Sequence, residues 1–232
     1  MKQKTRYIHE IKTISRERHN FIILSASKPK IRGLHSSLPL FPVGSKCLLD
    51  VQVGTIRKVF VDYEIFLVTG FDSENITSHV LSKHNDVRVL ENSQYKNNTV
   101  LDSLKMAINC CLEANTFIIY GDRIFNTKCI DVPDSKSLLF SHRSDKKNYD
   151  IGLSHNKDKK IVNASYGLPD VWSEIMYVQK EDFKKVKKVL NRTAKNKVFN
   201  MIQLLPFLFK SVDFYIHDDK NIDIQTIKEL IK

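Results

Sequence analysis

The chain has 232 residues, of which 37 are lysine or arginine and 26 are aspartate or glutamate, giving a formal net charge of +11. Its apolar share of 42% excludes a wholly disordered chain, and its charged share of 27% with a mean hydropathy of −0.29 excludes a protein made of many membrane spans. The positive excess favours polyanionic partners such as nucleotides, nucleic acids or phosphorylated metabolites.

The first twenty residues are rich in charge and contain no apolar stretch long enough for a signal core or a membrane span. We therefore expect a basic extension over residues 1–20, a single domain over residues 21–232, no membrane span and a cytoplasmic location. The cysteines show no CxxC spacing, which predicts reduced core thiols rather than a zinc cage or a disulfide framework: Cys47, Cys110, Cys111 and Cys129.

Strands and helices alternate in the first half of the chain. Short apolar runs bounded by polar residues predict strands, and apolar residues at helical spacing predict helices. The predicted order is a strand over 21–26, a helix over 46–60, a strand over 64–70, a helix over 73–83, a strand over 87–90, a helix over 100–111 and a strand over 116–122. Alternating units of this length predict right-handed crossovers and a largely parallel sheet.

The pattern changes beyond residue 122, where strands follow one another without a long helix between them. This predicts an antiparallel or mixed extension of the same sheet. The predicted elements are strands over 137–142, 149–155 and 160–165, helices over 181–190 and 198–210, a strand over 212–217 and a last helix over 224–232.

Three polar segments follow predicted strands, at the edge where parallel α/β sheets bind ligands. They are the loop over 25–44, the loop before the helix at Val100, and the pair Gly121-Asp122. An aspartate that leaves a buried strand beside a glycine is well placed to offer oxygen to a hard cation such as Mg²⁺. The alternative is that Asp122 only caps a turn.

The order of these pieces resembles the sugar-1-phosphate and phosphocholine nucleotidyltransferases, from about residue 21 to the end and most clearly before residue 126. Their strand ending in LAAG, their LPVGGK and VTGY segments, their loop pair that faces base and sugar, and their Gly-Asp and Ile-Asp-Thr metal motifs all have counterparts here. These are Leu24–Ser27, FPVGSK at 41–46, VTGF at 68–71, Asn98-Thr99, Gly121-Asp122 and Ile222-Asp223-Ile224.

The resemblance implies a three-layer α/β/α, Rossmann-like fold with a mixed, mostly parallel sheet, of the nucleotide-diphospho-sugar transferase type. It implies transfer of a nucleoside monophosphate from a nucleoside triphosphate to a sugar phosphate or a phosphocholine-like acceptor, with release of pyrophosphate and with Mg²⁺ as cofactor. The residues it assigns are Asp122 and Asp223 to the metal, Lys28, Lys30 and Arg32 to the triphosphate as catalytic groups, and Ser25, Ala26, Ser27, Asn98 and Thr99 to the nucleotide.

The sequence also departs from that family. The glycines of the phosphate loop are replaced within SASKPKIR, where Pro29 removes an amide donor, and Leu40 stands where the family has a lysine. A catalytically inactive nucleotide-binding or scaffolding protein of the same fold is therefore an open alternative. A glycosyltransferase that uses a nucleotide-sugar donor is another, although Arg123 and Ile124 after Asp122 break the Asp-x-Asp pattern of that class.

Other features have plainer readings. The lysine-rich segment over 180–197 could attract nucleic acid, but it has no aromatic ladder and is more typical of the solvated face of a packed helix. Trp172 is typical of a core anchor. The histidines show no HxH or HxxxH pair, which predicts surface or structural roles for residues such as His35, His84, His142, His155 and His217. Oligomeric state is not indicated.

Overall fold

The computed structural model describes residues 17–29, 36–132, 135–144, 150–193, 198–217 and 224–227. The strands are β1 (His19–Leu24), β2 (Pro42–Val43), β3 (Lys46–Cys47), β4 (Tyr63–Thr69), β5 (Val87–Glu91), β6 (Asn115–Tyr120), β7 (Arg123–Phe125), β8 (Ser137–Arg143), β9 (Ile151–His155), β10 (Ile161–Tyr166), β11 (Asp170–Val178), β12 (Phe214–His217) and β13 (Ile224–Thr226). The helices are α1 (Leu48–Val59), α2 (Ser73–Lys83), α3 (Val100–Cys110), α4 (Thr127–Ile130), α5 (Lys180–Asn191) and α6 (Met201–Phe209).

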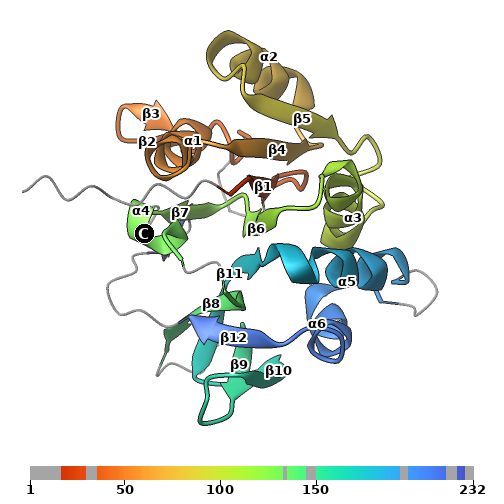
Figure 1. The fold of residues 1–232 in the computed structure, drawn as a ribbon. Helices are drawn as coiled ribbons and strands as arrows, with labels where there is room; N and C mark the ends of the chain where they lie inside the picture. Colours follow the sequence, from red (N-terminus) through yellow and green to blue (C-terminus); the bar gives the residue numbers. More distant parts are fainter. Residues whose placement is uncertain are drawn as a thin grey trace, which may run out of the picture.

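Within these residues a nine-stranded mixed sheet runs through the molecule (Figure 1). Its main order is β10-β9-β11-β6-β1-β4-β5, with β8 pairing to β11 and β12 pairing to β8. The strands β6, β1, β4 and β5 are parallel to one another. All six residues of β1 are buried, as expected for a strand in the middle of a sheet that is covered on both faces.

Helices cover both faces of this sheet and complete the predicted three-layer α/β/α fold. Apolar residues of α1 and α2 pack on one face, whereas α3, α5 and α6 pack on the other. The predicted helix over 73–83 matches α2, and the other helices of the first half agree within two residues. The mixed α/β architecture predicted from the alternation of elements is therefore confirmed.

The second half extends the sheet with antiparallel strands, as predicted, but through a strand that the pattern did not indicate. β11 pairs antiparallel with β6, β8 and β9 and so joins the two halves of the sheet. Its pairing with β8 shifts register between Trp172 and Met176, where Glu174 has a φ of 58°. This bulge interrupts the alternation of buried and exposed residues by which a strand is recognised in a sequence.

An aromatic row crosses three neighbouring strands in the core. The rings of Phe21 in β1 and Phe117 in β6 are parallel, with centroids 5.0 Å apart, and the ring of Tyr177 in β11 lies 4.8 Å beyond Phe117. Phe60, which caps the end of α1, meets Phe21 edge to face at 5.0 Å. Each member of the row is at most 6% exposed, so the row binds β1, β6 and β11 together through apolar contact.

A polar clamp joins the end of α1 to the strands beneath it. The Arg57 guanidinium binds both carboxylate oxygens of Asp86, with Nε donating to Oδ2 at 2.9 Å, and the Tyr63 hydroxyl donates to Oδ2 at 2.8 Å. The hydrogen bonds from Arg57 are the main reason why the pKa of Asp86 falls from 3.8 to about 2. Charged Asp86 therefore stabilises the fold.

We expect Asp86→Asn to lower the free energy of unfolding at pH 7 by about 1 kcal/mol, after allowance for solvent screening of this partly exposed pair. Because the pKa of Asp86 is lowered in the folded state, its contribution is present above pH 3.8 and is lost as the pH falls through about 2. Urea unfolding from pH 7 to pH 2 tests this: the difference between wild type and variant should shrink steadily below pH 4 and be mostly lost at pH 2, and a difference that does not change with pH contradicts it.

Two expectations about local structure are wrong. Residues 224–226 do not begin a helix: they form β13, which pairs antiparallel with β7 through Ile224 and Phe125. Ile227 is the first helical residue after this strand, and residues 228–232 of the predicted last helix lie outside the described residues. The four cysteines are free, as expected, but they are not all core thiols, because Cys47 is half-buried and Cys110 is exposed. Cys47 immediately precedes α1 and Cys110 is the last residue of α3, so both lie at helix ends that solvent reaches.

No helix in the part of the chain that the structure describes combines the length and apolar character that crossing a bilayer requires.

Candidate functional site

The turns that follow β1, β4 and β6 meet at one edge of the sheet. The Gly121 amide donates to the Leu24 carbonyl at 2.9 Å, and the Phe71 amide donates to the Ala26 carbonyl at 2.9 Å. The chain segments that contain Ser25, Ala26 and Gly121 are thus in direct contact, although β1 and β6 are far apart in the sequence. Because parallel strands end at a common edge, the sequence could predict this meeting without any knowledge of side chains.

Gly121 is required for this close approach. A Cβ atom at this position would lie 1.7 Å from the Ser25 Oγ and 2.7 Å from the Leu24 carbonyl oxygen, so only glycine fits. The Ser25 Oγ is buried and has no hydrogen-bond partner among the described residues. A buried, unpaired hydroxyl at a sheet edge is a donor that a bound ligand could satisfy.

The turn that carries Asp122 is fixed from two sides. The Gln52 side chain, which projects from α1 and is 1% exposed, donates to the Arg123 carbonyl at 2.8 Å. The Ile227 amide donates to the Asp122 carbonyl at 3.2 Å, which places the C-terminal segment beside this turn. Asp223, the second predicted metal ligand, lies outside the described residues. Sequence reasoning missed Gln52, because a glutamine within a helical pattern carries no signal of what it contacts.

Charged side chains alternate in sign around Asp122. The Arg123 guanidinium forms an ion pair with Glu174, and its Nε lies 3.4 Å from the Asp122 Oδ1. Burial raises the pKa of Glu174, and the charge of Arg123 opposes that rise. Glu174 reaches this position from the bulge in β11, so the missed strand also supplies a residue of the site. Its left-handed backbone is a strained conformation of the kind that is common at functional sites.

The loop between β5 and α3 lies beside the same edge. The Asn92 amide donates to the Thr69 carbonyl at 2.8 Å, and the Asn92 Oδ1 accepts a hydrogen bond from the Asn98 side chain at 3.0 Å. The Thr99 hydroxyl donates to the Asp102 carboxylate at 2.8 Å and caps α3. Asn98 and Thr99 therefore hold the loop in place, and their contact with a base or a ribose stays a prediction.

In the described part of the segment after β1, over residues 25–29, Lys28 is the cationic side chain. Ser27 and Lys28 are exposed, and the Lys28 ammonium lies 5.5 Å from the centroid of the Phe71 ring. Ala26, by contrast, is buried. Lys30 and Arg32 lie outside the described residues.

The residues present suit a magnesium ion. The Asp122 side chain is 21% exposed and follows directly after Gly121, whose backbone lies against the unpaired Ser25 hydroxyl. Mg²⁺ is usually held by one or two carboxylates together with water and substrate phosphate oxygens, so a single accessible carboxylate is an adequate protein contribution. Asp122 is the described residue that would hold the ion.

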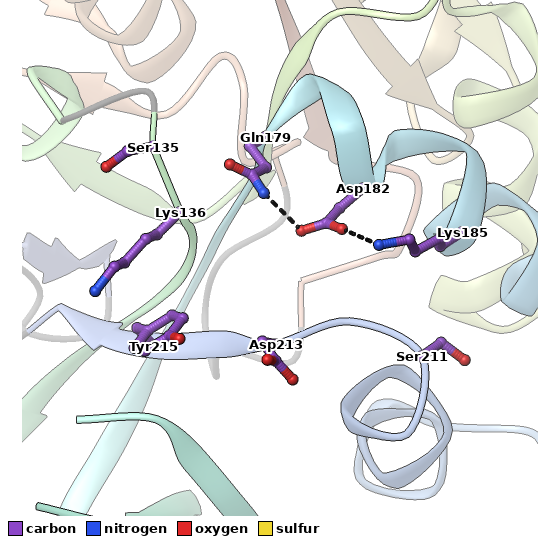
Figure 2. Close-up of a pocket in the computed structure, with 8 residues that line it drawn as sticks. All are labelled: Ser135, Lys136, Gln179, Asp182, Lys185, Ser211, Asp213 and Tyr215. Atoms are coloured by element: carbon purple, nitrogen blue, oxygen red, sulfur yellow. Dashed lines mark hydrogen bonds and ion pairs between the residues drawn. The ribbon is translucent and has the colours of Figure 1, made fainter. Parts of the chain in front are cut away.

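A separate polar cavity of about 500 Å³ lies at the opposite edge of the sheet (Figure 2). Its central group is Asp182, whose carboxylate accepts hydrogen bonds from Gln179, Lys185 and Ser137 at 2.8 to 3.1 Å. Lys136 extends beside the Tyr215 ring, 4.2 Å from its centroid. These groups satisfy one another, and the predicted site residues that the structure describes are not among those that line this cavity.

Two plainer expectations agree with the structure. In α5 the apolar side chains of Phe183, Val186 and Leu190 are buried while Lys184 is 77% exposed, which is the pattern of a packed amphipathic helix. Trp172 is 4% exposed, and its indole N–H donates to the Ile175 carbonyl at 3.0 Å, as a core anchor would. Its ring packs edge to face on Tyr120, directly before the Asp122 turn.

The comparisons with known proteins give a likeness in structure alone. No family model and no curated sequence matches this chain. Among solved structures, a CTP:phosphocholine cytidylyltransferase from Streptococcus pneumoniae matches with a TM-score of 0.76 at 16% identity, covering 93% of this chain and 100% of the other. A glucose-1-phosphate thymidylyltransferase from Bacillus anthracis, described as putative, matches with a TM-score of 0.69 at 13% identity. The match covers 90% of this chain and 89% of the other.

The inositol-1-phosphate CTP transferase from T. maritima matches with a TM-score of 0.67 at 15% identity, covering 91% of this chain and 89% of the other. At such low identity these matches establish the fold and not the chemistry. Because they span nearly the whole of each chain, the likeness includes the antiparallel second half as well as the parallel core. The chain therefore has the α/β fold of the sugar-phosphate and phosphocholine nucleotidyltransferases, as the resemblance of its motifs predicts.

Proposed function

We propose that this protein is a nucleotidyltransferase that transfers a nucleoside monophosphate from a nucleoside triphosphate to a phosphorylated small-molecule acceptor. The observation that carries the proposal is the convergence of Ser25, Gly121 and Asp122 with the exposed Lys28 segment at the ligand edge of a sheet of this type. The structural neighbours act on phosphocholine, inositol 1-phosphate or glucose 1-phosphate, so acceptors of these three kinds are the first to test.

In this reaction the acceptor phosphate attacks the α-phosphorus of the triphosphate, a new oxygen–phosphorus bond forms, and the bond to pyrophosphate breaks. Mg²⁺, when bound, supplies positive charge to the phosphate oxygens. Asp122 would hold that ion, the Ser25 hydroxyl would donate to the nucleotide, and Lys28 would face the triphosphate. The proposal also includes Lys30 and Arg32, which would face the triphosphate, and Asp223, which would share the metal ion with Asp122. It locates the protein in the cytoplasm.

We expect Asp122→Asn to lower the rate of pyrophosphate release by about a hundredfold or more, because a charge held at the reacting phosphates contributes mainly in the transition state. Release is measured with each of the common nucleoside triphosphates, paired in turn with phosphocholine, inositol 1-phosphate and glucose 1-phosphate. Asp158→Asn, an exposed carboxylate in the turn before β10, is the matched control and should leave the rate unchanged. Equal rates in wild type and Asp122→Asn would contradict the assignment.

The ion pairing around Asp122 favours a second function, which is nucleotide binding without catalysis. Arg123 lies between Asp122 and Glu174, and so competes with a metal ion for the same carboxylates. A protein that binds nucleotides without turnover would retain this arrangement. Calorimetry with nucleoside triphosphates and nucleotide-sugars, with and without Mg²⁺, separates the two: binding without pyrophosphate release supports the inactive protein, and release supports the enzyme. Donor hydrolysis without pyrophosphate release would instead indicate a glycosyltransferase.

A further inference from the structure

Between α1 and α2 lies a cluster of metal-binding side chains that plays no part in the proposed reaction. Cys47 precedes α1, Asp50 lies in its first turn, and His79 lies in the second half of α2. The Cys47 Sγ is 3.3 Å from the His79 Nε2, which in turn is 2.8 Å from the Asp50 Oδ1. One ligand atom from each residue falls within 4.8 Å of the other two.

We propose that Cys47, Asp50 and His79 form a binding site for a zinc ion. Sulfur, nitrogen and carboxylate oxygen are the donors that zinc takes. In a tetrahedral zinc site such donors lie about 3.3 to 3.6 Å from one another, as follows from the usual bond lengths. The Cys47–His79 and His79–Asp50 separations of 3.3 Å and 2.8 Å are shorter than this by at most about half an ångström, so a small outward movement of the His79 ring and the Asp50 carboxylate admits the ion.

The surroundings of the cluster support a site of this kind. The side chains of Asp50 and His79 are 12% and 17% exposed, so the ligands are largely shielded and still reachable from solvent. Magnesium prefers oxygen ligands, so the thiol and the imidazole select against the ion assigned to Asp122. With three protein ligands, a fourth position stays open for water.

His84 has a different role, because its second nitrogen is already engaged. Its Nε2 lies 2.7 Å from the Asp50 Oδ1, and its Nδ1 faces the Arg57 Nη2 at 3.3 Å. Since arginine can only donate, the His84 Nδ1 accepts from Arg57, which leaves the Nε2–H of His84 to donate to Asp50. His84 is therefore a positioning residue that orients the Asp50 carboxylate, as outer partners of metal ligands commonly do.

The Lys83 side chain stands close to the cluster and has to yield to the metal. The Lys83 ammonium lies 3.6 Å from the Asp50 Oδ2. Its side chain is 55% exposed, so it can turn into solvent at little cost when zinc neutralises Asp50. Arg57 stays in place, because its guanidinium is held by both carboxylate oxygens of Asp86, which is not one of the proposed ligands.

The test is a zinc titration of the full-length protein against a chromogenic chelator. We expect one zinc ion per chain in wild type, and loss of that binding in Cys47→Ser and in His79→Gln. His84→Gln should weaken the affinity about 10- to 100-fold without abolishing it. Cys110→Ser and His155→Gln, which change an exposed cysteine and a histidine of β9, are the matched controls and should bind as wild type does.

Two further measurements on the wild-type protein keep the test decisive if a variant fails to fold. Bound Co²⁺ should show the near-ultraviolet thiolate charge-transfer band and the intense visible bands of tetrahedral cobalt. Zinc should also slow the alkylation of Cys47 and leave that of Cys110 unchanged. Absence of zinc binding, equal binding by wild type and Cys47→Ser, or alkylation of Cys47 that zinc does not slow would each overturn the proposal. No substrate is involved, so the outcome is independent of whether the protein transfers nucleotides.

Discussion

Phe117→Ala is expected to lower the free energy of unfolding by about 3–5 kcal/mol. Phe117 is fully buried in the middle of the aromatic row, with Phe21 on one neighbouring strand and Tyr177 on the other. Removing its ring leaves a cavity bordered by three strands, and a backbone fixed by hydrogen bonds on both sides cannot collapse into it.

Urea unfolding followed through Trp172, the single tryptophan, measures the loss. Phe199→Ala removes the same ring from a position that is 63% exposed, and should change the free energy of unfolding by less than about 0.5 kcal/mol. Phe117→Leu keeps most of the apolar volume, so its loss in the free energy of unfolding should lie between those of Phe117→Ala and Phe199→Ala. Similar losses in Phe117→Ala and Phe199→Ala would show that the row contributes no more than surface rings do.

The second large effect is expected from Gly121→Ala, with a loss of about 3 kcal/mol. The added methyl group would lie 1.7 Å from the Ser25 Oγ and 2.7 Å from the Leu24 carbonyl oxygen, so β1 and β6 have to separate at their ends. This is also the place where the Asp122 turn begins. We therefore expect the variant to lose any nucleotide binding together with stability.

Gly54→Ala is the matched control, because a Cβ at Gly54 would meet no atom within 4 Å. Gly54 lies within α1, where alanine should stabilise the protein by about 0.5–1 kcal/mol. In the double variant with Ser25→Gly, the closest contact disappears while the carbonyl contact remains, so part of the stability should return. If the changes in the free energy of unfolding of Ser25→Gly and Gly121→Ala simply add in the double variant, the proposed clash is not the cause of the loss.

The parallel half of the fold could be predicted because its strands carry their signal locally. Segments such as residues 64–70 are apolar on both faces and end at a glycine, and the helix over 73–83 has polar residues at both ends. β11 gave no such signal, since its bulge at Glu174 changes which residues face the core. Residues 224–226 read as the start of a helix, whereas pairing with β7 determines their conformation.

The candidate site was predictable only where chain topology determines it. The end of β6 must lie near the end of β1 in a parallel sheet, so the position of Asp122 followed from the pattern of elements. The contacts of Gln52 and Glu174 depend on how a helix face and a bulge are turned, and the sequence pattern does not contain that information. The Cys47 cluster is similar: His79 lies 32 positions from Cys47, and the two meet only because α1 and α2 pack on the same face of the sheet.

The central position of β1 also governs how the chain can fold as it is synthesised. β1 is made before every other strand that the structure describes, yet one of its two neighbours, β6, pairs through residues such as Thr116, which lies 96 positions after Asn20. Until that segment has been translated, one edge of a strongly apolar strand has no partner and is exposed to association with other chains. Newly made chains halted before residue 115 should therefore depend on chaperones far more than chains released after β6 is complete.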